Sequence, residues 1–566
     1  MTLPYSLAAR RNIVTVSVED YFQGPAFAEL IDQRHWPRFV SHIEQNTAAA
    51  LSLLERHGAT ATFFVPAWVA ERHRDLVREI TRRGHEAAAA GLSGKTFRGA
   101  GRAALIDDAK RTRDLIEAAG GQRVRGFRAA DHLLGPSDLW GLEALAEAGY
   151  EYDSSLHPSA RRFSHQPWRR FIHRHHSRGH AIWEVPLSSV RALGFDLPVA
   201  GGNWFRQLPE AVLRHLVERW TEATDQPFVM YFRVWDLDET EPAVTGAPRL
   251  SRIRHYRNPG KVPKLIDAFL SAGQFTSISE HLGIEAKEAP VPMPSRSAAA
   301  AVTIGSRART PVSVVIPCYN EQSALPYLSN ALKELACHPR YEFRFVFVDD
   351  GSRDDTVRLL NELFGSLPGV KVIRHPVNRG VAAAIMTGIK ASDTEVVCSM
   401  DCDCTYDPNE LAVMIPMLGP TVDLVTASPY HPQGAVLRVP AWRLSLSKGA
   451  SALYRVVLRH RLHTYTSCFR VYRRTAFCDL ELSSHGFLGV AEMLGLLDLR
   501  GGKIVEYPAV LSVRMLGRSK MRVLRTIAGH LGLLARFALM RMSKPTRPIG
   551  GVFQPAVYAS KGLDRE

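Results

Sequence analysis

The chain has 566 residues, of which 46% are hydrophobic and 22% charged, and its formal net charge is +15. This composition is typical of a globular protein and excludes a largely disordered chain, and the length predicts two or more domains. A basic surface suits phosphate ligands of any kind, but no helix-turn-helix, zinc-finger or RNA-binding motif is present, which argues against nucleic acid.

The cysteines and the N-terminus bear on the location of the protein. All seven cysteines lie in the C-terminal half, and their number is odd. Met1–Arg11 contains only scattered apolar residues, unlike a secretory signal. Because paired cysteines are typical of secreted proteins, this pattern favours reduced thiols and a cytoplasmic location. Asp401-Cys402-Asp403-Cys404 invites a metal–thiolate reading, but we expect ordinary thiols at Cys402 and Cys404.

The first part of the chain alternates apolar strands with helical patterns. We expect strands at 13–18, 61–65, 183–185 and 229–232, and helices near 45–57, 74–83 and 137–148. This alternation predicts an α/β barrel or sandwich for a first domain, residues 1–285.

Residues 286–310 are rich in Pro, Ser and Ala and have no amphipathic period, which predicts a linker. A second domain of ordinary size is expected at 311–545, followed by a C-terminal tail at 546–566.

The second domain opens as a series of strand–helix units. Apolar strands are expected at 312–316, 343–348, 370–373 and 396–400, with helices near 325–335, 357–363 and 381–390. Alternating strands and helices with continuous apolar strands predict a parallel sheet covered on both faces.

Five acidic residues follow these strands, where parallel sheets bind their ligands. They are Glu321, Asp349, Asp350, Asp401 and Asp403. When a sugar leaves a nucleotide diphosphate, negative charge builds on the phosphate, and a cation held by carboxylate oxygens neutralises it. The pair Asp401 and Asp403 therefore predicts a catalytic site for a divalent cation, beside a strand-end pair that accepts hydrogen bonds from a nucleotide base.

Six motifs are spread over residues 311–525: Val-Ile-Pro-Cys-Tyr-Asn-Glu (315–321), Val-Asp-Asp-Gly-Ser (348–352), Asn-Arg-Gly-Val (378–381), Met-Asp-Cys-Asp (400–403), Ser-Cys-Phe-Arg (467–470) and Arg-Met-Leu-Gly-Arg-Ser-Lys (514–520). Together they resemble family 2 glycosyltransferases of the dolichol-phosphate-mannose-synthase type. The resemblance implies a GT-A (Rossmann-like) fold, dependence on Mg²⁺ or Mn²⁺, and inversion at the anomeric carbon. It also implies that the nucleotide-sugar is bound by Pro317, Tyr319, Glu321, Asp349, Asp350, Arg379 and Asp401.

The acceptor is expected to bind near Arg514, Arg518 and Lys520, because Arg binds phosphate through two parallel hydrogen bonds. Arg470 is placed in the same group by its motif, and a solvated basic turn is the alternative reading. A lipid phosphate is already ionised near neutral pH, whereas a hydroxyl acceptor needs a base. Glu492 is the expected catalytic base for a hydroxyl, or else a residue that packs a helix.

Residues 527–542 are apolar but are interrupted by His530, Arg536 and Arg541. The segment is shorter than the ~20 apolar residues of a membrane span. It predicts either an interfacial amphipathic helix, with peripheral association at the inner membrane face, or a helix packed on the domain core.

The first domain carries motifs of its own: Val-Ser-Val-Glu-Asp-Tyr-Phe-Gln (16–23), Arg-Gly-His-Glu (83–86), Gly-Phe-Arg-Ala (126–129), Tyr-Asp-Ser-Ser (152–155) and Tyr-Phe-Arg-Val-Trp (231–235). They resemble NodB-like polysaccharide deacetylases, which have a distorted (β/α) barrel. Such enzymes use a catalytic Asp, a metal site of one acid and two His, and a late His.

This chain departs from the deacetylase pattern at nearly every one of these positions. Ser17 replaces the catalytic Asp, Ala90 and Gly94 replace the His ligands, and Arg233 replaces the late His. Since zinc in a hydrolytic site takes three protein ligands, a single remaining acid cannot hold it. The acids that remain are Glu19 and Asp20.

We therefore expect the first domain to be an inactive deacetylase. It would bind a sugar or an anionic group through Arg128, Arg233 and Trp235, or serve as a scaffold.

The predicted function is transfer of a sugar from a UDP- or GDP-sugar to a lipid phosphate of the polyprenyl kind. Three alternatives remain open at this stage. The acceptor could be a hydroxyl of a glycan, lipid or small metabolite; the chain could be a bifunctional transferase and deacetylase; or it could be a non-catalytic carbohydrate-binding protein. The intact acidic pairs argue against the last of these.

Overall fold

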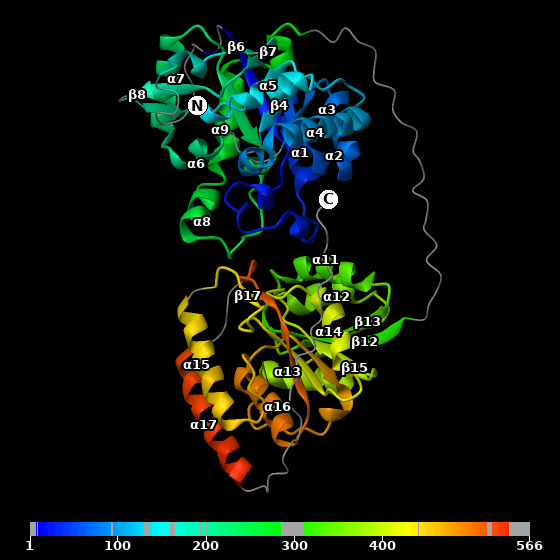
Figure 1. Ribbon diagram of the computed structural model, residues 1–566. Coiled ribbons are helices and arrows are strands. Elements are labelled where there is room, and N and C mark those ends of the chain that lie inside the picture. Colours follow the sequence, from blue (N-terminus) through cyan, green and yellow to red (C-terminus); the bar gives the residue numbers. More distant parts are fainter. Residues whose placement is uncertain are drawn as a thin grey trace. The chain divides into compact units, whose positions relative to one another are not determined.

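The computed structural model describes residues 7, 10–91, 94–129, 135–158, 163, 165–177, 179–192, 195–199, 201–284, 309–439, 441–517 and 523–542. The chain divides into two compact units, Met1–Ser306 and Arg307–Glu566, with Met515–Gly517 grouped with the first (Figure 1). The predicted tail lies outside the described residues, as does the predicted linker up to residue 308.

The first unit is built on a nine-stranded sheet with the strand order β10-β1-β2-β3-β4-β5-β7-β6, and β11 also pairs with β1. All neighbours are parallel except β6 and β7. The strands are β1 Arg11–Ser17, β2 Thr62–Pro66, β3 Glu86–Gly91, β4 Gly126–Ala129, β5 Tyr152–Asp153, β6 His173–Ser177, β7 His180–Glu184, β10 Val229–Arg233 and β11 Gln274–Thr276. The predicted α/β class is confirmed, and in the described part of the chain the ladder is an open path from β10 to β6.

Helices cover this sheet, and a hairpin of β8 (Ser189–Ala192) and β9 (Phe195–Pro198) stands apart from it. Each main helix buries residues at spacings of three and four; α7, for example, buries Leu213, Leu216, Val217 and Trp220. The helices are α1 Ile43–Arg56, α2 Ala67–Arg72, α3 Arg74–Arg82, α4 Gly94–Gly120, α5 Trp140–Glu147, α6 Asn203–Gln207, α7 Glu210–Ala223, α8 Arg249–Tyr256, α9 Lys261–Ala272 and α10 Ile278–His281.

The second unit contains a seven-stranded sheet with the order β14-β13-β12-β15-β18-β16-β19. Only β18 is antiparallel to its neighbours, and β17 pairs with β20 outside this sheet. The strands are β12 Thr310–Cys318, β13 Tyr341–Asp349, β14 Val370–Arg374, β15 Val396–Ser399, β16 Leu424–Ser428, β17 Ala435–Val436, β18 Arg470–Arg473, β19 Ile504–Pro508 and β20 Val510–Leu511. The four strands predicted in this unit are present, within three residues at every end.

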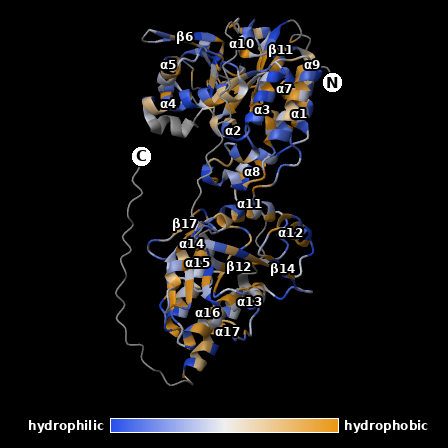
Figure 2. Cartoon of the chain, turned by 90° about the vertical axis from the view of Figure 1, so that its right-hand side faces the viewer, coloured by the Kyte–Doolittle hydropathy of each residue, from blue (hydrophilic) through white to orange (hydrophobic). Residues whose placement is uncertain are grey.

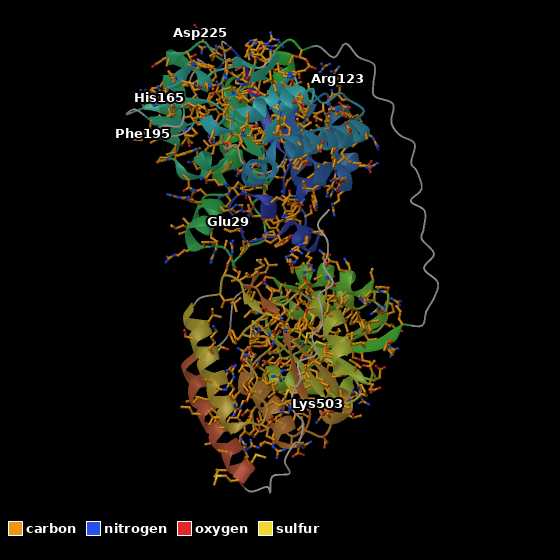
Figure 3. The ribbon with its side chains drawn as sticks, in the orientation of Figure 1. Glu29, Arg123, His165, Phe195, Asp225 and Lys503 are labelled. Atoms are coloured by element: carbon orange, nitrogen blue, oxygen red, sulfur yellow. The ribbon has the colours of Figure 1, made fainter. Side chains whose placement is uncertain are left out.

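Two apolar cores lie on the two faces of this sheet. Val314 and Phe347 belong to one core, Val315 and Val346 to the other, as the alternation of side chains along a strand requires. Side chains fill the space between helices and sheet (Figure 3). The helices are α11 Leu325–Ala336, α12 Thr356–Phe364, α13 Val381–Ala391, α14 Glu410–Met414, α15 Ala441–Val457, α16 Phe487–Leu499 and α17 Val523–Met542.

The register of the second sheet brings the predicted site together. Cys318 pairs with Asp349, and Asp349 with Arg374, so β12, β13 and β14 end at the same edge. The segment that follows β15 starts at this edge as well, because β15 runs parallel to β12. Among the described residues, no helix combines the length and the apolar content needed to cross a membrane.

Candidate functional site

Asp349 and Asp350 lie at the end of β13 and have different partners. Both oxygens of Asp349 accept from the backbone N–H of Ser352 at 3.3 Å, and the side chain is fully buried. Asp350 accepts from the N–H groups of Arg379 (2.9 Å) and Gly380 (2.7 Å) and is joined to His375 at 2.7 Å. Asp350 therefore holds the loop that precedes α13, and contact with a nucleotide stays a prediction for both acids.

Glycine is required in the two loops that meet at Asp350. Gly351 has φ +74° and Gly380 has φ +101°, backbone conformations that residues with a side chain rarely adopt. A Cβ atom would also lie 2.7 Å from the Val377 carbonyl carbon at the first position and 2.5 Å from the His485 carbonyl oxygen at the second. These motif glycines let the loops approach closely.

Asp401 and Asp403 follow β15, beside Glu321. Burial, and next the charge of Asp403, raise the pKa of Asp401 to about 7. Asp403 accepts from the N–H of Thr405 at 3.1 Å with one carboxylate oxygen. Three carboxylates thus share one edge of the sheet, and carboxylate oxygens are the ligands that Mg²⁺ and Mn²⁺ prefer.

Arg514 bridges two of these carboxylates, Asp403 and Glu321. Its Nε donates to Asp403 Oδ2 at 2.6 Å, and its Nη2 donates to Glu321 Oε1 at 3.2 Å. The guanidinium predicted to bind an acceptor phosphate therefore lies against the carboxylates predicted to bind the cation. The sequence did not predict these pairs, and Arg518 and Lys520 of the same loop lie outside the described residues.

The predicted binding residues near this edge differ in their exposure. Arg470, in the middle of the sheet on β18, is fully buried and donates to the carbonyl oxygens of Val490 and Tyr465, each at 2.9 Å. These bonds tie β18 to α16, and contact of Arg470 with an acceptor phosphate stays a prediction. Arg379, by contrast, is exposed, and Pro317 and Tyr319 are partly exposed at the end of β12.

Glu492 on α16 does not have the surroundings of a catalytic base. It is fully buried, and its carboxylate accepts from the N–H (3.1 Å) and hydroxyl (2.6 Å) of Ser483 and from the N–H of Ser484 (2.7 Å). Arg536 of α17 donates to it at 2.7 Å. With both oxygens occupied, Glu492 fixes the loop before α16, and its expected role as a catalytic base stays a prediction.

The deacetylase-like pocket of the first unit is small. It is lined by Ser17, Val18, Glu19, Phe64, Pro66, Ala90 and Arg128, and the described residues leave a volume of about 20 Å³ there, enough for a water molecule. Gly94 begins α4. The register places Ala90 beside Arg128 on adjacent strands.

Arg128 is fully buried in this pocket, and its hydrogen-bond partners among the described residues are neutral. It donates to the carbonyl (3.0 Å) and hydroxyl (2.7 Å) of Ser154 and to the hydroxyl of Thr15 (2.9 Å), and it lies 3.9 Å from the Phe64 ring centroid. Burial lowers the pKa of Arg128 to about 9.

The two acids left from the metal set are both engaged. Glu19 pairs with Arg233 at 3.1 Å. Asp20 is buried and accepts from the hydroxyl of Ser41 (2.5 Å) and the N–H of His42 (3.2 Å). Within the described part of the chain, no group of three or more His, Cys, Asp or Glu could hold a metal ion.

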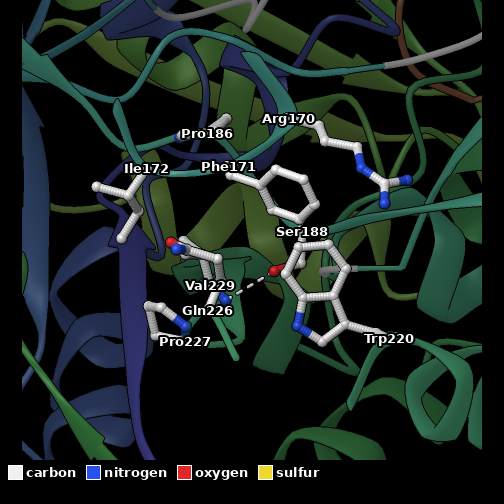
Figure 4. A pocket seen from close by; sticks show the side chains of 9 residues that line it. All are labelled: Arg170, Phe171, Ile172, Pro186, Ser188, Trp220, Gln226, Pro227 and Val229. Carbon is white, nitrogen blue, oxygen red and sulfur yellow. Dashed lines mark hydrogen bonds between the residues drawn. The ribbon is translucent and has the colours of Figure 1, made fainter. Parts of the chain in front are cut away.

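A second hollow of the first unit lies around Trp220 (Figure 4). Phe171 and Trp220 pack with their ring centroids 5.8 Å apart, and the hydroxyl of Ser188 accepts from the N–H of Val229 at 2.9 Å. The space between these side chains is too narrow for a water molecule, so this hollow is part of the core.

Residues 313–480 match the family model described as glycosyl transferase family 2. A polyprenol monophosphomannose synthase of Mycolicibacterium smegmatis is 32% identical over 215 residues, which are 37% of this chain and 80% of that protein. The chain belongs to glycosyl transferase family 2. A second relative of this glycosyltransferase, a dolichol-phosphate mannosyltransferase of Pyrococcus furiosus, is 32% identical over 213 residues, 37% of this chain and 59% of that protein.

The first unit of the glycosyltransferase has matches of its own. Residues 35–152 match the model described as polysaccharide deacetylase, and residues 154–283 match a domain of unknown function, DUF3473. The family models thus confirm, for both units, the resemblances stated from the motifs.

Among solved structures, a glucosyl-3-phosphoglycerate synthase of Mycobacterium tuberculosis, in complex with Mn²⁺ and uridine diphosphate, is similar to this chain. The match has 19% identity and a TM-score of 0.32, over 42% of this chain and 82% of that chain.

Proposed function

We propose that the second unit transfers a sugar from a nucleoside diphosphate sugar to a lipid phosphate of the polyprenyl kind. The observation that carries this proposal is the meeting of Glu321, Asp401 and Asp403 with Arg514 at the carboxyl ends of the strands. Carboxylates suit the cation of a metal diphosphate, and a guanidinium suits a phosphate. The names of the two relatives, a polyprenol monophosphomannose synthase and a dolichol-phosphate mannosyltransferase, support the lipid phosphate.

Asp401 and Asp403 would hold Mg²⁺ or Mn²⁺ in this proposal. The fit rests on the donor set, which consists of hard carboxylate oxygens on one loop, with Glu321 close by. The cation would neutralise charge on the departing diphosphate. Since such cations take several of their ligands from the phosphates themselves, a complete set of protein ligands is not required.

The surroundings of Glu492 favour a phosphate over a hydroxyl acceptor. A hydroxyl needs a base to remove its proton, whereas a lipid phosphate is ionised at neutral pH. Glu492, the base expected from the sequence, has both oxygens engaged by Ser483, Ser484 and Arg536.

An assay of the full chain with UDP- and GDP-sugars, Mn²⁺ and polyprenyl phosphate tests the proposal. Mass spectrometry is expected to detect a polyprenyl phosphate sugar with one donor and no product when unphosphorylated polyprenol replaces the phosphate. Transfer to the free alcohol at the same rate, or no consumption of any donor, would rule the proposal out.

We further propose that the first unit binds a ligand or acts as a scaffold and does not hydrolyse amides. Ala90 and Gly94 offer no metal ligand, and Glu19 and Asp20 are paired within the protein. The full chain carrying Asp401→Ala and Asp403→Ala, which removes the proposed cation site of the second unit, is expected to contain no stoichiometric zinc by elemental analysis. It should also release no acetate from N-acetylated sugars. Stoichiometric zinc together with acetate release would contradict this.

A further inference from the structure

His375 follows β14 and lies in a buried position beside the acidic end of β13. Its backbone N–H donates to the Asp349 carbonyl at 2.8 Å, so it extends the pairing of the two strands by one residue. Its side chain is buried, and both ring nitrogens have partners at hydrogen-bond distance. An imidazole engaged in this way acts on a ligand only through the residues that it orients.

The two ring nitrogens of His375 join two elements of the second unit. Nδ1 lies 2.7 Å from Asp350 Oδ1, and because an ionised carboxylate can only accept, Nδ1 carries the proton of this bond. Nε2 lies 3.0 Å from the hydroxyl of Thr387, which donates to it when the imidazole is neutral. The imidazole therefore fixes the orientation of Asp350 relative to α13.

Thr387 is an unusual residue for its helix. α13 consists largely of hydrophobic residues, which are orange in Figure 2, and Thr387 and Lys390 are its only polar side chains. A hydroxyl that is taken out of water is unfavourable without a partner, and Thr387 finds one in Nε2 of His375. The two side chains thus form a connected polar network within an apolar layer.

Asp350 holds the segment from His375 to Gly380 at both of its ends. At the start the imidazole binds Oδ1, and at the end the N–H groups of Arg379 (2.9 Å) and Gly380 (2.7 Å) donate to the carboxylate. Arg379 is exposed, and it is the residue of this segment that the motifs predict to bind the nucleotide-sugar. Its position relative to the sheet therefore depends on the orientation of one carboxylate.

We propose that His375 is a positioning residue for the donor: by orienting Asp350, it holds Arg379 where the guanidinium meets the diphosphate of the nucleotide-sugar. The inference rests on the proposed function. A guanidinium binds phosphate through two parallel hydrogen bonds, and this geometry depends on where the loop holds the Arg backbone. Loss of the imidazole donor should therefore raise KM for the donor sugar nucleotide and leave kcat nearly unchanged, since His375 touches no reacting atom.

Isothermal titration calorimetry of the full chain with UDP and with GDP, each in excess Mn²⁺, tests this role without turnover. His375→Gln places an amide near the position of Nε2 and removes the donor to Asp350. The Kd of the nucleotide that binds is expected to rise about tenfold, the lower end of the range for loss of a residue that orients a ligand group. His375→Asn places an NH₂ donor near the position of Nδ1 and should keep the Kd within about threefold of the wild type.

His338→Gln is the matched control. His338 precedes β13, at the opposite end of this strand from Asp350, and its Nδ1 accepts from the N–H of Arg340 at 3.2 Å. The same exchange at this position should leave the Kd within about twofold of the wild type. Melting followed by circular dichroism compares the folding of the variants, and initial rates separate KM from kcat.

A folded His375→Gln protein with the Kd of the control would overturn the proposal. Equal weakening by His375→Gln and His375→Asn would also overturn it, in favour of a packing role. If His375→Gln does not fold, Thr387→Val decides, because it removes the partner of Nε2 at nearly constant volume. This variant is expected to raise the Kd about threefold, and a wild-type Kd would overturn the proposal.

The same titrations distinguish this inference from the proposed function. A wild-type chain that binds neither UDP nor GDP would contradict the proposed function and this inference with it. Nucleotide binding that His375→Gln weakens and His375→Asn preserves, without sugar transfer to any acceptor, would contradict the proposed reaction and leave the role of His375 in place.

Discussion

Replacement of Asp403 by Ala is expected to lower kcat/KM for sugar transfer by about 10³-fold, the size of effect seen when one group that stabilises transition-state charge is removed. Asp403 is one of the two carboxylates proposed to hold the cation, and its Oδ2 accepts a hydrogen bond from Arg514 Nε at 2.6 Å. The variant thus loses a metal ligand and leaves Arg514 without one of its two acids. Initial rates across a Mn²⁺ titration would measure the loss.

Asp393→Asn is the matched control for this variant. Asp393 lies in the same unit, is half exposed, and pairs with Arg344 at 3.2 Å on the surface. Because an exposed ion pair contributes little, the control should keep kcat/KM within about twofold. Both proteins should melt cooperatively in circular dichroism. If Asp403→Ala were folded and as active as the control at every Mn²⁺ concentration, the proposed cation site would be wrong.

Replacement of Glu492 by Gln is expected to destabilise the protein by about 3 kcal/mol while the folded fraction keeps its turnover of a lipid phosphate within about threefold. The buried carboxylate accepts from two backbone N–H groups, a hydroxyl and Arg536. An amide would turn an NH₂ group toward one of these donors and leave the Arg536 charge unpaired. Urea denaturation followed by tryptophan fluorescence measures the free energy of unfolding.

Glu362→Gln is the control, since Glu362 is half exposed on α12 and pairs with Arg358 at 2.8 Å. It should change the free energy of unfolding by no more than about 0.5 kcal/mol. A Glu492→Gln protein of wild-type stability that loses activity by two orders of magnitude would restore Glu492 as a catalytic base and would favour a hydroxyl acceptor.

The pKa of Glu492 gives this prediction a pH dependence. Burial alone would raise the pKa, but the bonds from Ser483 and Ser484 and the charge of Arg536 outweigh burial and lower it. A carboxyl whose pKa is lower in the folded state stabilises the protein above its unfolded pKa, and this stabilisation is lost as the pH falls through the folded value. The difference in stability between wild type and Glu492→Gln should therefore be full at pH 7 and shrink below about pH 4.5.

The strands of the second unit were predictable because the sheet is buried on both faces. Val312–Ile316 is apolar at nearly every position, and a run of this kind between two Pro residues is typical of a parallel strand. The antiparallel strand β18, inserted between β15 and β16, was not predicted. Strand order depends on contacts between distant segments, and no local pattern encodes them.

The strand β3 of the first unit shows how packing overrides propensity. Its sequence, Glu86-Ala-Ala-Ala-Ala-Gly91, has the composition of a helix, yet it pairs with β2 and β4. A Cβ atom on Gly91 would lie 2.0 Å from the Phe127 ring, so a small residue is needed where that ring crosses the strand. The need for small residues comes from a neighbour 36 positions away in sequence and is invisible locally.

The sequence by itself determined the chemical inventory of this protein: carboxylates at the ends of parallel strands, a basic loop near the C-terminus, and no His at the positions of the deacetylase metal ligands. Local periodicity and motif spacing carry that information. Only the tertiary structure decided which charges meet. Arg514 and Glu321 are 193 residues apart, and Arg536 and Glu492 are 44 apart. A charged side chain takes its role from the partner that folding brings within about 3 Å, and chain distance does not restrict that choice.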